Sequence, residues 1–78
     1  MSRKINKLSA IEVSKKNKPG RYGDGGGLWL QVSKFGTKAW IFRYMISGKA
    51  RHMGLGDLNT FSLQEARERA RKQRQLLA

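Results

Sequence analysis

The sequence predicts an α+β domain in which a three-stranded antiparallel β-sheet packs on a C-terminal α-helix. Three observations indicate this class: apolar residues alternate in three consecutive segments, short glycine-containing turns separate those segments, and the end of the chain has helical apolar spacing. With 78 residues, the chain can build one hydrophobic core but not two.

The N-terminal part of the chain is polar and basic before the first apolar residues appear. Residues 1–7 are expected to form a flexible tail, and residues 8–78 a single domain. Leu8–Val13 can form a short helix, with Ser9 placed to cap its N-terminus. The stretch that follows, Ser14–Gly20, is rich in Lys, Asn, Pro and Gly and is expected to be a loop.

Three consecutive glycines, Gly25, Gly26 and Gly27, precede the first predicted strand. Glycine is used where the backbone needs a positive φ or a close approach, so Arg21–Gly27 is expected to be a loop. A phosphate-binding P-loop would need a following Gly-Lys-Ser/Thr, and none follows here. The glycines are therefore expected to shape the backbone rather than to bind a nucleotide.

Three segments with alternating apolar residues follow, separated by turns of the lengths found in β-hairpins. The predicted strands are Leu28–Val32, Lys38–Ile46 and Lys49–Leu55, with turns at Ser33–Thr37 and Ser47–Gly48. The turn lengths fix both registers, and a slip of one residue would move the large apolar side chains to the wrong face. The predicted opposing pairs are Val32 with Lys38, Leu30 with Trp40, Leu28 with Phe42, Trp40 with Leu55, Phe42 with Met53, Arg43 with His52, and Ile46 with Lys49.

The last predicted element is a helix that begins after Ser62. Ser62 and Glu65 have the spacing of a capping box. The two alanines in its apolar stripe should let the helix lie close to the sheet, and the stripe consists of Leu63, Ala66, Ala70 and Leu77. No glycine or proline ends the helical pattern before Ala78, so we expect the chain to be a fragment of a longer protein.

The chain is strongly basic, with 17 Lys and Arg against 5 Asp and Glu, a formal charge of +12 and a pI near 11.1. Such a charge on a small domain favours a polyanionic partner over a merely solvated surface, because the charges repel one another. The absence of cysteine and the single histidine, His52, exclude disulfides and thiolate or multi-histidine metal sites. No catalytic constellation of Ser, His and Asp or of paired carboxylates can be assembled.

We therefore expect no enzyme activity, metal, cofactor or small-molecule substrate for this chain. No apolar run approaches the roughly 18 residues of a membrane span, and the N-terminus has no signal-peptide segment. We expect a cytoplasmic protein without membrane contact, and a monomer when the domain is isolated.

The predicted helix would cover the sheet face that carries Trp40, Phe42 and Tyr44, which makes these aromatics core residues. Trp29 and Ile41, on the other face, could be covered by Leu8–Val13 or could be exposed, and the sequence leaves both readings open. His52 could likewise be an ordinary surface histidine. The whole of this second face consists of Trp29, Gln31, Ala39, Ile41, Arg43, Met45, Ala50, His52 and Gly54.

Several of these side chains match the hydrogen-bonding groups of DNA. Gln31 can contact adenine, Arg43 can contact guanine, and an apolar side chain such as Met45 can meet the thymine methyl group. The predicted base contacts are Gln31, Arg43, Met45 and His52, and the predicted phosphate contacts are Lys34, Lys38, Lys49, Arg51, Arg3 and Lys4. Whether the basic tail enters a minor groove is left open.

The ordered set of motifs resembles a known family. Asp24–Leu30 (DGGGLWL) looks like its SDGGGLYL signature, and Gly36–Trp40 with Phe42–Tyr44 looks like its GSKLWRFRY strand. Gly48-Lys49, Leu55-Gly56 and Ser62–Arg67 (SLQEAR) follow in the family's order and spacing. The chain thus resembles the N-terminal arm-type DNA-binding domain of prophage and genomic-island tyrosine integrases.

The resemblance implies sequence-specific binding of double-stranded DNA at arm-type attachment sites, through a β-sheet in the major groove. This binding would support integration and excision of a prophage or mobile element, with the catalytic domain elsewhere in a protein that assembles on DNA in the bacterial nucleoid. It also implies that Arg43, Gln31 and His52 lie near DNA. The alternatives from the residues alone are an RNA-binding module of ribosomal or double-stranded-RNA type, and a domain whose basic helix docks on an acidic protein.

Overall fold

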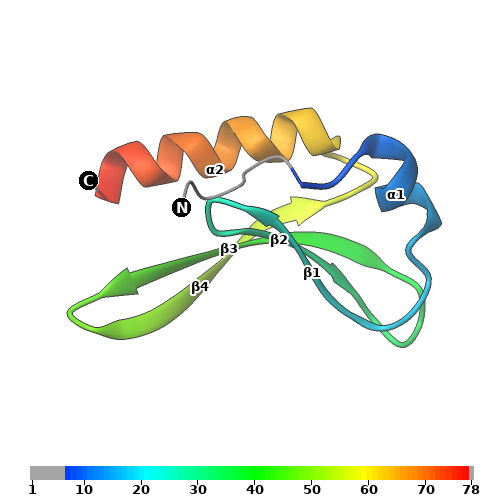
Figure 1. Cartoon of the computed structure of the whole chain (residues 1–78), viewed down its shortest axis with the longest axis horizontal. Helices are drawn as coiled ribbons and strands as arrows, with labels where there is room; N and C mark the ends of the chain where they lie inside the picture. The colour runs from blue at the N-terminus through cyan, green and yellow to red at the C-terminus, as the bar shows by residue number, and fades with distance from the viewer. Residues whose placement is uncertain (1–6, 78) are drawn as a thin grey trace.

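A computed structural model describes residues 7–77, which form a four-stranded antiparallel sheet with both helices on one face (Figure 1). The strands lie in the sheet in chain order, β1-β2-β3-β4. Neither helix in this described range is long and apolar enough to cross a membrane. The elements are α1 (Ala10–Lys15), β1 (Gly20–Gly25), β2 (Leu28–Val32), β3 (Lys38–Ile46), β4 (Lys49–Asp57) and α2 (Leu63–Leu77).

The sheet has four strands where the sequence predicted three, because Gly20–Gly25 forms β1 instead of belonging to loops. The strand sequence GRYGDG has neither an apolar alternation nor a strong β propensity, so its conformation comes from pairing with β2. A bulge between Gly23 and Gly25 and positive φ angles of 63° and 89° at Gly26 and Gly27 make the tight return into β2.

The predicted register between β2 and β3 is confirmed at all three pairs, with Leu30 opposite Trp40 at the centre. Between β3 and β4, three of the four predicted pairs are confirmed, among them Arg43 with His52. The pairing of Trp40 with Leu55 is wrong, because a bulge places Gly56 opposite Trp40 and β4 extends to Asp57.

The bulge has a packing cause at the end of β4. Leu55 is the additional residue, and its side chain is buried in the core. Gly56 has a φ of 110°, and a side chain there would collide with the ring of Phe61. Phe61 can therefore close over the end of the strand, and its carbonyl accepts a 2.8 Å hydrogen bond from the Trp40 indole.

The core lies between the sheet and the two helices, with Trp40 fully buried at its centre. The prediction that Trp40, Phe42 and Tyr44 are core residues is confirmed: Tyr44 is half-buried, with its ring stacked on Phe42 at a centroid distance of 5.8 Å. Close approach of α2 to the sheet follows from two fully buried alanines, Ala66 and Ala70.

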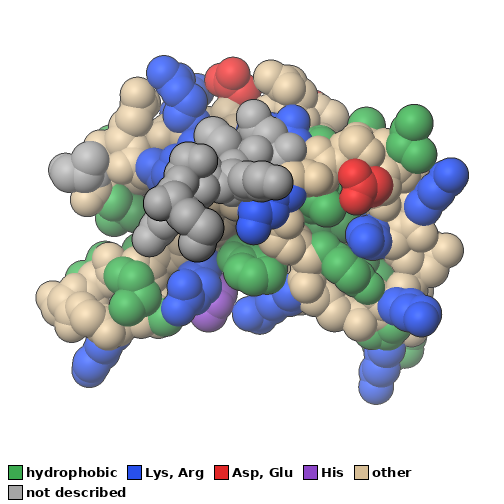
Figure 2. Space-filling view, viewed as in Figure 1, with side chains coloured by type: hydrophobic (Ala, Val, Ile, Leu, Met, Phe, Trp, Pro, Cys, Tyr) green, Lys and Arg blue, Asp and Glu red, His purple; other side chains and the backbone are tan. Residues whose placement is uncertain are grey.

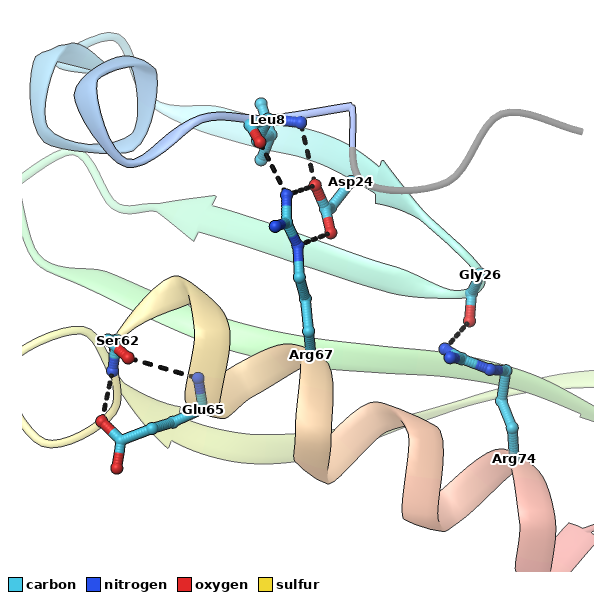
Figure 3. Close-up of polar contacts among 7 residues, drawn as sticks. All are labelled: Leu8, Asp24, Gly26, Ser62, Glu65, Arg67 and Arg74. Carbon is cyan, nitrogen blue, oxygen red and sulfur yellow. Dashed lines mark hydrogen bonds and ion pairs between the residues drawn. The ribbon is translucent and has the colours of Figure 1, made fainter.

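Both helices begin at the predicted caps. Ser9 Oγ accepts from the Glu12 amide at the start of α1, and Ser62 and Glu65 form the reciprocal capping box of α2, with distances of 3.2 and 3.1 Å (Figure 3). The α1 helix starts and ends two residues later than Leu8–Val13. Its contribution to the core is Val13, while Ile11 is 66% exposed.

A buried carboxylate joins the N-terminal segment, β1 and α2. Asp24, only 1% exposed, accepts hydrogen bonds from the Leu8 amide at 2.8 Å and from two nitrogens of Arg67 at 2.9 Å (Figure 3). Arg67 also donates to the Leu8 carbonyl at 2.6 Å. Hydrogen bonding to Asp24 raises the pKa of Arg67 above its ordinary value, so its guanidinium stays charged at any physiological pH.

Replacement of Asp24 should be among the most destabilising single changes in this fold. Asp24→Asn removes the charge opposite Arg67 and one of the acceptors for its guanidinium, and should lower the free energy of unfolding by about 2–4 kcal/mol. Urea unfolding followed by tryptophan fluorescence measures this loss. Glu68→Gln, at an exposed position of α2, is the control and should change the value by less than about 0.5 kcal/mol. Equal values for the two variants would contradict a stabilising role for Asp24.

The β3–β4 turn offers a stabilising substitution. Ser47 and Gly48 have φ angles of 50° and 77°, and Ser47 is the one non-glycine residue with positive φ in the described chain. Asparagine tolerates this conformation better, and Asn-Gly is the preferred pair in such turns. Ser47→Asn should raise the free energy of unfolding by about 0.5 kcal/mol, whereas Ser47→Val should lower it. A lower melting temperature for Ser47→Asn would contradict the turn geometry.

Candidate nucleic-acid interface

The sheet face opposite the helices is open in the described part of the chain. Leu8 and Val13 belong to the core cluster on the helix side, so Leu8–Val13 does not cover Trp29 and Ile41. Both of those side chains are half-buried, and the Trp29 ring lies against Gly23 of β1. The lack of a side chain at Gly23 leaves room for this ring, with 3.3 Å between its nearest atom and the position of a β-carbon. Packing within the fold therefore explains why a large aromatic residue stands at position 29, without a contact to a ligand.

Three polar side chains from three strands meet on the open face. Arg21 Nε donates to Gln31 Oε1 at 3.0 Å, and Arg21 Nη1 lies 3.5 Å from His52 Nε2. A hollow on this face is lined by Arg21, Trp29, Arg43 and His52. The sheet thus brings together the predicted residues Gln31, Arg43 and His52 and adds Arg21 to them.

Arg21 is absent from the predicted site residues because the sequence predicts a loop at Arg21–Gly27, whereas the segment forms β1. In β1 it lies opposite Gln31, and the strand places Arg21 and Gly23 on the open face and Tyr22 on the core side. The sequence holds only a weak indication of this. Side chains alternate between faces along a strand, and over the four residues from Arg21 to Asp24 this alternation would put Arg21 on the face of Gln31.

Arg43 is exposed on β3, within the long β3–β4 hairpin. Its guanidinium lies 4.0 Å from the sulfur of Met45, which is 55% exposed. The Arg43 amide donates to the Gly27 carbonyl at 2.7 Å, and a side chain at Gly27 would come within 2.6 Å of the Arg43 carbonyl. The glycine turn therefore holds the backbone that carries Arg43.

The predicted phosphate contacts lie in different surroundings. Lys34 is exposed in the β2–β3 loop, with its ammonium 5.2 Å from the ring centre of Phe35. Lys49 and Arg51 are exposed on β4. They pair with Ile46 and Tyr44, so their side chains leave the sheet on the helix side, and not on the open face that carries His52. Lys38 donates to the carbonyls of Val13 and Ser14 at 2.9 Å, at the end of α1. Arg3, Lys4 and most of the predicted tail lie outside the described residues.

Positive charge is spread over the surface of the domain. Figure 2 shows lysine and arginine side chains on the side of the helices and also at the lower surface, where the histidine lies among them. The acidic side chains visible in this view lie higher, on the side of the helices. No group of three potential metal-ligating residues occurs among the described residues. This basic, open sheet face defines a nucleic-acid-binding type of domain.

Comparison with known proteins identifies the family. A family model described as "Arm DNA-binding domain" matches residues 3–78, and the chain belongs to this family. It is 44% identical over 64 residues to the integrase of Shigella phage Sf6 and, to the same extent, to the prophage integrase IntS of Escherichia coli (strain K12). The match covers 81% of this chain but only 17% of each relative, so the chain spans about a sixth of their length. The resemblance to integrase arm-type domains is confirmed.

Proposed function

We propose that this domain binds arm-type attachment sites in double-stranded DNA by presenting its open sheet face to the major groove. The binding would serve site-specific integration and excision of a prophage or mobile element. The observation that carries the proposal is the convergence of Arg21, Gln31, Arg43 and His52 on the one sheet face that the helices leave open. We assign DNA cleavage and joining to other parts of a longer integrase, which would assemble on DNA in the bacterial cytoplasm.

Arg43 is the first candidate for a base contact, because it is exposed and its backbone is fixed by the Gly27 turn. A guanidinium can donate to O6 and N7 of guanine at once, which makes it the commonest specific reader of that base. Met45, beside it, can contact a thymine methyl group. His52, opposite Arg43 in the ladder, can contact an acceptor on the next base pair.

Gln31 and Arg21 would act as a pair. Gln31 needs both its oxygen and its amide nitrogen for the two contacts to adenine. Its oxygen accepts from Arg21, but a carbonyl oxygen has two lone pairs and can accept again from adenine N6. Arg21 would then fix the orientation of the Gln31 amide and supply positive charge to the same base step.

Phosphate contacts would surround the base contacts. Lys34 is exposed in the β2–β3 loop, and Lys49 and Arg51 are exposed on the helix side of the edge strand β4, from which they would reach the DNA backbone around that edge. Arg3 and Lys4 are proposed to contribute from the tail. Lys38 uses two of its three N–H donors on carbonyls of α1, which leaves one donor for a phosphate. Such contacts orient the domain on the duplex without reading its sequence.

The open face favours DNA over RNA. Sheets that read single-stranded RNA stack bases on exposed aromatics, and the major groove of an RNA duplex is too narrow for a sheet. Trp29 is the aromatic ring on this face, and it is half-buried against Gly23. Phe42 and Tyr44 are stacked on each other on the core side.

The experiment is a selection of duplexes from a randomised DNA pool by the purified domain, followed by fluorescence anisotropy with a selected duplex, its scrambled version and the matching RNA duplex. Tighter binding to the selected DNA at 150 mM salt is expected, by a factor of about 10³ or more. Affinity should fall with salt by about 0.9 logarithmic units per tenfold salt for each phosphate neutralised. Equal affinity for the selected and scrambled duplexes, or for the RNA duplex, would refute the proposal.

Two substitutions separate sequence reading from charge. Arg43→Ala should weaken binding to the selected duplex by about 1–3 kcal/mol and relax the preference at one base position. Lys34→Ala should weaken binding to selected and scrambled duplexes alike and reduce the salt slope by about 1. Anisotropy titrations with single-base variants of the selected duplex measure both effects. If Arg43→Ala lowered all affinities equally, Arg43 would be a phosphate contact instead.

A further inference from the structure

Gly54 is the glycine for which neither φ nor a steric contact requires the absence of a side chain. Of the chain's nine glycines, seven have a positive φ, and at Gly23 a side chain would press on the Trp29 ring. Gly54 has neither constraint, since a β-carbon there would meet nothing within 4 Å. A glycine inside a strand weakens it, and commonly marks a bulge or a place where another backbone or a ligand comes very close. Here the additional residue of the bulge is Leu55 and not Gly54, which leaves the close approach as the role for Gly54.

Gly54 lies where the open face meets the free edge of the sheet. It is opposite Ile41 in β4, the outermost strand, and the bulge follows immediately. In the β3–β4 ladder, Ile46 and Lys49 close the two-residue turn and form a hydrogen-bonded pair. Hydrogen-bonded and non-hydrogen-bonded pairs alternate from there, so Ile41 and Gly54 form a non-hydrogen-bonded pair. The Gly54 amide then points outward from β4, where it can donate to an anion.

Two cations from α2 stand beside this edge. A groove between β4 and α2 is lined by Gly54, Met53, Leu55, Arg69, Lys72 and Gln73, with no acidic residue among them. Arg69 is held in place because its guanidinium stacks on the Phe61 ring at 4.3 Å. Phe61 can take that position because Gly56 has no side chain. Glu65 lies one turn before Arg69, but its carboxylate accepts a hydrogen bond from the Ser62 amide and is thereby held at the N-terminus of α2.

We infer that a DNA sugar–phosphate strand passes over the β4 edge at Gly54, with its phosphates bound by Arg69, Lys72 and the Gly54 amide. This inference rests on the proposed function, because phosphates flank any element that enters a major groove. It adds to the interface a set of contacts from the helix that backs the sheet. Gly54 then acts by its lack of a side chain, which lets the backbone come close.

The first test uses the selected duplex and Gly54→Ala. Alanine should leave the melting temperature of the free domain unchanged or slightly higher, because it restricts the unfolded chain and meets no neighbour. The same change should weaken DNA binding about tenfold, and Gly54→Val should weaken it further. A Gly54→Ala domain that is stably folded and binds as tightly as the wild type would overturn the inference.

The second test compares charges on the same helix by their salt slopes. Arg69→Gln and Lys72→Gln should each reduce the slope of log affinity against log salt by about 0.9. Arg71→Gln is the matched control, because Arg71 lies more than a quarter turn around α2 from both residues and does not line the groove. It should leave the slope unchanged. Equal slopes for all three variants would overturn the inference while the wild-type preference for the selected duplex, and with it the proposed function, still stood.

Discussion

The architecture depends on one buried carboxylate. Asp24 lies in β1, yet its hydrogen bonds reach the Leu8 amide and the guanidinium of Arg67 in α2. The N-terminal segment and α2 are thereby both held to β1, on the side of the sheet to which Asp24 points (Figure 3). The N-terminal segment cannot cross to the other face while this contact is intact. The open face is thus a consequence of an interaction on the opposite side of the sheet.

The Asp24–Gly27 segment links the core to the candidate interface. Asp24 holds the helix, the Gly26 carbonyl accepts from Arg74 at 2.9 Å, and the Gly27 carbonyl accepts from the Arg43 amide. The carbonyls of Gly26 and Gly27 therefore accept hydrogen bonds from within the domain. This agrees with the prediction that these glycines shape the backbone and do not form a P-loop. The Asp24–Gly27 signature therefore positions the backbone of Arg43. It can do so without any contact between its own residues and DNA.

The sequence predicted the parts of the fold that local patterns determine. Alternation along β3 and the lengths of two turns were sufficient to predict strand pairs such as Leu28–Phe42 and Arg43–His52. A slip of one residue in either register would expose Trp40. The strand β1 and the Trp40–Gly56 pairing were missed because their causes are tertiary: pairing with β2 in one case and the packing of Phe61 in the other. Because β1 was not predicted, the position of Arg21 on the open face opposite Gln31 was not predicted either.

Two groups of basic residues, out of the 17 in the chain, differ in what they contact. Lys38, Arg67 and Arg74 donate to backbone carbonyls or to Asp24 on the helix side, where each replaces water with a fixed acceptor. On the open face, the guanidinium groups of Arg21 and Arg43 contact neighbouring side chains: Gln31 and His52 for Arg21, and Met45 for Arg43. Repulsion within this second group opposes folding, and a polyanion that neutralises it would stabilise the folded state. Loss of a cation from the first group should therefore appear as lost stability, and loss from the second as lost affinity with stability kept or improved.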